Sequence, residues 1–183
     1  ALDSYEIAEM AYHIEREELG LSGGRQDQYS ATFGGFNFIE FLGKVTIVNP
    51  LRIRAEIIDE LQYRLMLCFT GISRPSAGVI DDQVARYVQG NKDVIESLDR
   101  SKELAVAMKN ALLLGHLNEF GSLLHEAWIQ KQRFSTRMTN PDINELYEAA
   151  RRNGALGGKL MGAGGGGYLM FLCEFDRWHI VAQ

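Results

Sequence analysis

The sequence predicts an α+β fold in which a mostly antiparallel sheet packs against a block of helices. Strand-like segments lie toward both ends of the 183-residue chain, and a helical pattern fills the middle, from about residue 75 to residue 152. Near the C-terminus, a run of glycines from Gly162 to Gly167 separates two further strand-like segments. Strands and helices segregated in this way are typical of α+β domains, and the length suits one domain with a sizeable core.

The elements of the first third are predicted from their apolar spacing and from the glycines that end them. Apolar residues recur at helical spacing in the first segment, whereas the later segments are rich in aromatic and β-branched residues. Glycines end these segments because they favour turns and helix ends. The expected elements are a helix at 4–19, a short helix at 26–33, a hairpin of 36–41 and 44–48 that turns near Gly43, and a strand at 63–69.

The remainder of the chain is predicted to be helical until its last thirty residues. Breaks at Gly90, Gly115 and Pro141 divide the apolar periodicity into separate helices. No internal repeat, linker or low-complexity segment is visible. The expected elements are helices at 76–89, 92–114, 117–134 and 142–152, strands at 155–161 and 167–173, and the start of another helix from Asp176.

Composition argues against several classes of function. The net charge is −5 and charges of both signs are interspersed, whereas a nucleic-acid surface needs a basic stripe. No apolar run approaches the length of a membrane span, and no signal peptide is visible. Cys68 and Cys173 lie in apolar runs, which indicates buried thiols in a reducing cytoplasm. We therefore expect a cytoplasmic protein that binds neither nucleic acid nor membrane.

The glycine run satisfies the G-x-G-x-x-G pattern through Gly162, Gly164 and Gly167. That pattern marks a dinucleotide site only where a helix follows the glycines, and here the apolar run 168–173 predicts a strand. A strand–loop–strand turn is therefore expected. Glycines permit close approach of a backbone or a phosphate. The alternative, a glycine-rich hairpin without a ligand, stays open.

A second informative segment surrounds Asp27. Gly23 and Gly24 precede the short helix at 26–33, which places free N–H groups and a positive dipole at the helix start. Asp27 can simply be a residue that the helix dipole favours. However, Glu15 lies twelve residues upstream on the preceding helix. The two carboxylates can converge, so that one orients or deprotonates a hydroxyl while the other holds Mg²⁺.

Together these residues resemble the C-terminal part of GHMP kinases. The stretch 159–167, Lys-Leu-Met-Gly-Ala-Gly-Gly-Gly-Gly, is similar to the third conserved motif of that family. Residues 15–37, with Gly-Gly-Arg-Gln-Asp-Gln at their centre, resemble the subgroup of bacterial D-glycero-D-manno-heptose 7-phosphate kinases and fucokinase-like sugar kinases. Thr70-Gly71-Ile72-Ser73-Arg74 also fits this subgroup. The resemblance covers nearly the whole chain, 1–183, and implies the family's C-terminal fold with a ferredoxin-like sheet.

The resemblance implies a role for each motif, with ATP and Mg²⁺ as cofactors. Asp27 matches the catalytic aspartate that accepts or orients the proton of the attacking sugar hydroxyl, and Glu15 matches the magnesium-binding glutamate. The loop that braces the ATP phosphate loop matches Gly162, Ala163, Gly164, Gly165, Gly166 and Gly167. Substrate binding is implied for Gly23, Gly24, Arg25, Gln26, Gln28, Ser73, Arg74 and Lys159. For the cations Arg25, Arg74 and Lys159, a solvated surface charge is the alternative, and Arg25 stands where many relatives have lysine.

The chain also departs from the family. Nothing in it resembles the N-terminal Pro-x-x-x-Gly-Leu-Gly-Ser-Ser phosphate loop, and the C-terminal end looks cut, so we expect a fragment that is inactive without its N-terminal partner segment. The expected reaction is transfer of the γ-phosphoryl group of ATP to a sugar or sugar phosphate, first of all D-glycero-D-manno-heptose 7-phosphate. A kinase for fucose, galactose or another hexose and a non-catalytic binding module are the alternatives.

Overall fold

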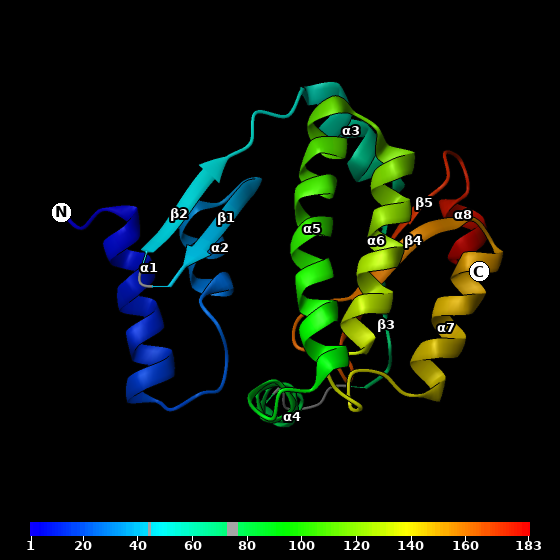
Figure 1. The fold of residues 1–183 in the computed structure, drawn as a ribbon. Helices are drawn as coiled ribbons and strands as arrows, with labels where there is room; N and C mark the ends of the chain where they lie inside the picture. The colour runs from blue at the N-terminus through cyan, green and yellow to red at the C-terminus, as the bar shows by residue number, and fades with distance from the viewer. Residues whose placement is uncertain (44, 73–76) are drawn as a thin grey trace. The chain divides into compact units, whose positions relative to one another are not determined.

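The computed structural model describes residues 1–43, 45–72 and 77–183. They form two compact units, Ala1–Ile53 and Arg54–Gln183, each with its own secondary structure (Figure 1). Most of the helices and strands expected from the sequence are present in these two units.

The first unit consists of two helical segments and a hairpin. Its elements are α1 (Ser4–Tyr12), the π-helix η1 (His13–Glu18), α2 (Gln26–Phe33), β1 (Asn37–Leu42) and β2 (Val45–Pro50). A capping box starts α1, because Asp3 and Glu6 each accept a hydrogen bond from the other's backbone N–H. The small core of this unit contains Ala8, Tyr29 and Val48.

The second unit contains a three-stranded sheet and most of the helices. Its elements are α3 (Ala55–Arg64), β3 (Leu65–Phe69), α4 (Ala77–Val88), α5 (Lys92–Leu114), α6 (Leu117–Gln132), α7 (Pro141–Arg152), β4 (Ala155–Leu160), β5 (Tyr168–Cys173) and α8 (Trp178–Val181). The strand order is β3-β5-β4 and both pairings are antiparallel. Its core gathers Trp128, Ile143, Leu160, Leu169 and Phe171 between the helices and the sheet.

Close packing of α6 against β4 positions the end of the sheet (Figure 1). A Cβ atom on Gly157 of β4 would lie 2.0 Å from the carbonyl oxygen of Gly121 on α6. Ordinary van der Waals contact begins near 3.4 Å, so only glycine permits this spacing. The preceding connection also depends on glycine: Gly115, between α5 and α6, has a left-handed φ of 79°.

The predicted α+β class, the hairpin, the helical block and the two strands beside the glycine loop are confirmed. Three expectations need correction. The strand expected at 63–69 begins at Leu65, because residues 55–64 form the amphipathic helix α3, which the sequence reading missed. The helix expected at 4–19 is helical to Glu18, but its second half has π-helical hydrogen bonding. Of the two cysteines, Cys173 is buried as expected and Cys68 is only partly buried.

Replacing Asn140 by Ala is expected to lower the free energy of unfolding of the second unit by about 1 kcal/mol. The Asn140 side chain caps α7 by accepting a 2.9 Å hydrogen bond from the N–H of Ile143, a fully buried core residue. Both tryptophans, Trp128 and Trp178, lie in this unit, so urea unfolding followed by tryptophan fluorescence reports the change. Unchanged stability would show that the cap contributes nothing to the packing of α7.

Candidate active site

The glycine loop joins β4 to β5 and is anchored to neighbouring segments by its backbone. The N–H of Gly165 donates to the carbonyl of Met138 at 2.9 Å, and the N–H of Gly167 donates to the carbonyl of Ile72 at 2.8 Å. In return, the carbonyl of Gly167 accepts from both the backbone N–H and the hydroxyl of Thr70, each at 2.9 Å. The loop is therefore held in one conformation from both sides.

Packing alone already explains two of the loop's glycines. Gly164 has φ = 121°, and a Cβ there would lie 2.3 Å from the sulfur of Met138. A Cβ on Gly166 would lie 2.7 Å from the carbonyl oxygen of Ile72. A side chain is excluded at Gly164 by backbone conformation and by space, and at Gly166 by space alone. The expected strand–loop–strand turn is confirmed, and the nucleotide-related role of its residues stays a prediction.

Two lysines lie at the base of this loop. The ammonium of Lys131, in the last turn of α6, donates hydrogen bonds to the carbonyl of Leu160 at 2.9 Å and to the carbonyl of Gly162 at 2.6 Å. Burial lowers the pKa of Lys131 to about 7, and the positive charge of Lys159 adds to this effect. Burial also lowers the pKa of Lys159 itself, one of the predicted substrate-binding residues. Lys159 is partly buried, which favours a role in the site over that of a freely solvated surface charge.

The free energy of unfolding of the second unit is expected to rise as the pH increases from about 7 toward 10. In this range an unfolded Lys131, with its ordinary pKa of 10.5, keeps a proton that the folded form has released. Since the unfolded state binds more protons, raising the pH favours the folded state. Lys159 acts in the same direction.

Lys131→Met removes this contribution, so the slope should fall by up to about 1.4 kcal/mol per pH unit. Urea unfolding at pH 7, 8 and 9 measures the slopes of both proteins. Lys102→Met is the control, because the exposed Lys102 pairs with Asp99 and should leave the slope unchanged over this range. Equal slopes in the wild type and in Lys131→Met would contradict the expectation.

In the first unit, Gln28 connects the start of α2 to η1. Its amide Nε2 donates a 2.7 Å hydrogen bond to Oε2 of Glu15, whose same oxygen lies 3.5 Å from the guanidinium of Arg16. The other amide atom, Oε1 of Gln28, is buried and has no hydrogen-bond partner among the described residues. This arrangement brings together two of the predicted site residues, Glu15 and Gln28, and leaves one buried acceptor beside a carboxylate.

Asp27 and Gln26 lie in the first turn of α2 and are exposed. Among the residues that the structure describes, none forms a hydrogen bond or an ion pair with the Asp27 carboxylate. A carboxylate in the first helical turn is favoured by the helix dipole. Its exposure leaves it accessible to a substrate hydroxyl, as the predicted catalytic role requires.

Arg16 organises the loop before α2, a role that the sequence reading did not find. Its guanidinium donates to the carbonyl of Gly24 at 3.2 Å and to the carbonyls of Leu21 and Ser22 at 3.4 Å. A Cβ on Gly23 would lie 2.6 Å from the carbon at the centre of that guanidinium. Gly23 and Gly24 therefore let the loop wrap closely around Arg16. The sequence does not reveal this contact, because Arg16 and Gly24 are eight residues apart.

Arg25, predicted to bind substrate, already has protein partners. Its guanidinium forms a 2.7 Å ion pair with Glu9 and lies 4.3 Å from the centre of the Tyr12 ring. Oε1 of Glu9 also accepts a 2.5 Å hydrogen bond from the hydroxyl of Tyr29, which ties α2 to α1. The two remaining predicted residues, Ser73 and Arg74, lie outside the described residues.

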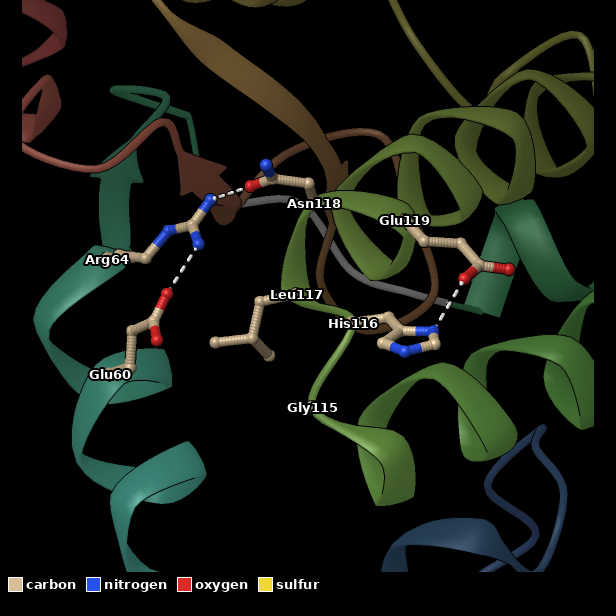
Figure 2. Close-up of a pocket in the computed structure, with 7 residues that line it drawn as sticks. All are labelled: Glu60, Arg64, Gly115, His116, Leu117, Asn118 and Glu119. Carbon is tan, nitrogen blue, oxygen red and sulfur yellow. Dashed lines mark hydrogen bonds and ion pairs between the residues drawn. The ribbon is translucent and has the colours of Figure 1, made fainter.

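A cavity of about 390 Å³ lies at the start of α6, and none of the predicted site residues that the structure describes lines it (Figure 2). Its main feature is the buried Arg64, which donates to the carbonyl of Cys173 and to the side chains of Glu60 and Asn118. These contacts neutralise Arg64 and join α3, β5 and α6. The cavity is lined by Glu60, Arg64, Gly115, His116, Leu117, Asn118 and Glu119.

Comparison with known proteins identifies similar sequences. Residues 104–177 match the family model for GHMP kinases C terminal. The chain is 41% identical over 174 residues to D-glycero-alpha-D-manno-heptose 7-phosphate kinase of Campylobacter jejuni. The aligned region covers 94% of this chain and 51% of the relative. It is 33% identical over 171 residues to the bifunctional fucokinase/GDP-fucose pyrophosphorylase of Arabidopsis thaliana. This aligned region covers 92% of this chain and 16% of the relative. The chain spans about half the length of the first of these relatives.

Solved structures resemble the chain over nearly all of its length. The crystal structure of a D-glycero-D-manno-heptose 1-phosphate kinase from Bacteroides thetaiotaomicron is 36% identical, with a TM-score of 0.68 over 98% of this chain and 48% of that one. L. major mevalonate kinase in complex with R-mevalonate is 21% identical, with a TM-score of 0.75 over 99% of this chain and 53% of that one, and supports the fold alone. In the described part of the chain, no helix is both long and apolar enough to cross a membrane.

Proposed function

We propose that the chain belongs to the GHMP kinases, whose C-terminal family model matches residues 104–177, and that it forms part of an ATP-dependent sugar kinase. The observation that supports this most is the combination of an accessible Asp27 at the start of α2 with a Glu15 carboxylate held beside that helix by Gln28. We further propose that all of residues 1–183 correspond to the family's C-terminal region, and that the phosphate loop for ATP comes from sequence that this chain does not contain.

The proposed acceptor is D-glycero-D-manno-heptose 7-phosphate, phosphorylated at its anomeric hydroxyl. This rests on the 41% identity to a kinase named for that substrate. A free hexose such as fucose is the second candidate, favoured by the 33% identity to a bifunctional fucokinase. The proposed location is the cytoplasm, where ATP and sugar phosphates are both present.

The residues of the first unit fit a magnesium ion by their chemistry. Mg²⁺ prefers oxygen ligands, keeps several waters and needs only one or two carboxylates besides the phosphates. Glu15 provides a carboxylate, and the unpartnered Oε1 of Gln28 provides a second oxygen in the same small region. When bound, Mg²⁺ would neutralise the charge of the ATP phosphates.

The chain's own residues then have separate tasks. Asp27 accepts the proton of the attacking hydroxyl, or orients that hydroxyl toward the γ-phosphoryl group. The glycine loop, fixed by its bonds to Met138 and Ile72, supports the phosphate loop and adds positioning, on which phosphoryl transfer mainly depends.

A substrate screen with the full-length protein that contains this chain distinguishes the two acceptors. The assay follows ADP release with D-glycero-D-manno-heptose 7-phosphate, fucose, galactose and mannose, each at several concentrations. We expect kcat/KM for the heptose phosphate to exceed that for every free hexose by at least about 100-fold, because the lost phosphate contacts are charge-assisted. A preference for a free hexose would overturn the proposed acceptor.

A further inference from the structure

The two lysines at the glycine loop come from α6 and β4, which lie side by side (Figure 1). Lys131 lies in the last turn of α6. On β4, Gly157 faces α6, because a Cβ there would meet backbone atoms of Gly121 and His125. Side chains alternate between the faces of a strand, so Lys159, two residues further along, projects toward the same side. The two ammonium groups thus share the α6 side of the sheet at the end of β4.

The position of the Lys131 ammonium is fixed by the backbone at the loop's first turn. Two of its three N–H groups donate to the carbonyls of Leu160 and Gly162. Leu160 ends β4 and Gly162 begins the glycine loop. One N–H of Lys131 is left for another acceptor at this point.

Neither lysine has an anionic partner among the residues that the structure describes. No carboxylate there forms an ion pair with Lys131 or Lys159. The charged group that acts on the Lys131 ammonium is Lys159. Because both groups are positive, Lys159 repels it. Partly buried ammonium groups of like charge are unfavourable unless something compensates them. Titratable groups whose pKa is shifted by burial and by a neighbouring charge are candidates for a functional site.

We propose that Lys131 and Lys159 together form an anion-binding site at the base of the glycine loop and that its ligand is a phosphoryl group. Lysine is a compact cation suited to phosphate as a point charge. The adjacent glycines present no side chain that would keep a phosphate away. The inference deepens the proposed function, on which it rests for the class of ligand, and it adds Lys131 to the residues that the sequence suggested.

The test is a titration of the 183-residue chain with inorganic pyrophosphate, followed by NMR of the lysine side-chain nitrogens and by calorimetry. We expect saturable binding. Lys131→Met and Lys159→Met should each weaken it at least about tenfold, because each removes one charge-assisted hydrogen bond to the anion. The control, Lys102→Met, should bind like the wild type, because Lys102 is exposed and paired with Asp99. Lys131→Arg and Lys159→Arg keep the charge and serve where a methionine variant fails to fold.

Binding should also depend on pH in a defined direction. An anion that binds the protonated ammonium raises the pKa of Lys131, so affinity should be higher at pH 6.5 than at pH 8.5. No saturable binding, equal affinity in all the variants, or loss in Lys131→Met with none in Lys159→Met would overturn the proposal. The last result would assign Lys131 to bracing the loop alone.

Competition experiments separate the possible sources of the phosphoryl group. ATP without Mg²⁺ and mannose 6-phosphate are each titrated against pyrophosphate, and the stronger competitor identifies the nucleotide or the sugar phosphate as the source. Kinase assays of the full-length protein keep the two proposals distinct. Sugar phosphorylation with unaltered pyrophosphate binding in both methionine variants overturns the lysine site alone, whereas lysine-dependent binding without any kinase activity overturns the proposed function alone.

Discussion

Asp27→Asn in the full-length protein is expected to lower kcat by about 10²–10⁴-fold, the usual contribution of a general base. Asparagine keeps the size and the position at the start of α2 but cannot accept the proton of the sugar hydroxyl. Because Asp27 is exposed and has no partner in the described residues, the change should leave the fold intact. Binding of ATP, measured by calorimetry, should stay within about twofold of the wild type.

Asp142→Asn is the matched control for this prediction. Asp142 is also an exposed aspartate in the first turn of a helix, α7, and it belongs to neither motif. Its replacement should leave kcat unchanged. Turnover that survives in Asp27→Asn at the level of Asp142→Asn would refute the catalytic role of Asp27.

Gly157→Ala is expected to destabilise the second unit by about 3 kcal/mol or more, at the upper end of the costs of overpacking. The new methyl group would lie 2.0 Å from the carbonyl oxygen of Gly121 and 2.7 Å from the N–H nitrogen of His125. Both are backbone atoms of α6, so the clash cannot be relieved by turning a side chain. The helix must move off β4, which exposes part of the core around Trp128.

Urea unfolding followed by tryptophan fluorescence measures this effect, with Gly78→Ala as control. Gly78 lies in α4, and a Cβ there would come within 3.3 Å only of the end of the flexible Arg137 side chain. Alanine at a helical position is favoured over glycine by about 0.5–1 kcal/mol, so this variant should be neutral or slightly more stable. A loss in Gly157→Ala no larger than about 1 kcal/mol would mean that α6 and β4 adapt easily.

Periodicity and glycine positions predicted most of the fold, because these signals are local. The β5 segment following Gly167 is apolar and β-rich, which was enough to distinguish a strand–loop–strand turn from a dinucleotide site. Helix α3 was missed, since its apolar positions, Ile57, Ile58 and Leu61, run directly into the apolar strand β3 without a glycine or proline between them. The π-helical hydrogen bonding of η1 was not predicted either, because six residues are too few for apolar spacing to distinguish i→i+5 from i→i+4 bonding.

The candidate site was predictable only where its residues form local motifs. Asp27, Glu15 and the glycine loop were found through their sequence neighbours. Arg16 and Lys131 were missed because they act on backbone carbonyls that are distant along the chain or unmarked by any motif. A charged residue that binds carbonyl groups leaves no pattern in a single sequence, and only the folded arrangement reveals it.

Phosphoryl transfer by the full-length protein that contains this chain is the measurement that bears most directly on the proposed kinase function. The protein is incubated with ATP, Mg²⁺ and D-glycero-D-manno-heptose 7-phosphate, and the product is identified by ³¹P NMR. We expect a second phosphate on the anomeric carbon, formed by the wild type and lost in Asp27→Asn. Absence of transfer to every sugar and sugar phosphate tested, from a protein that is folded and binds ATP, would contradict the proposed kinase function.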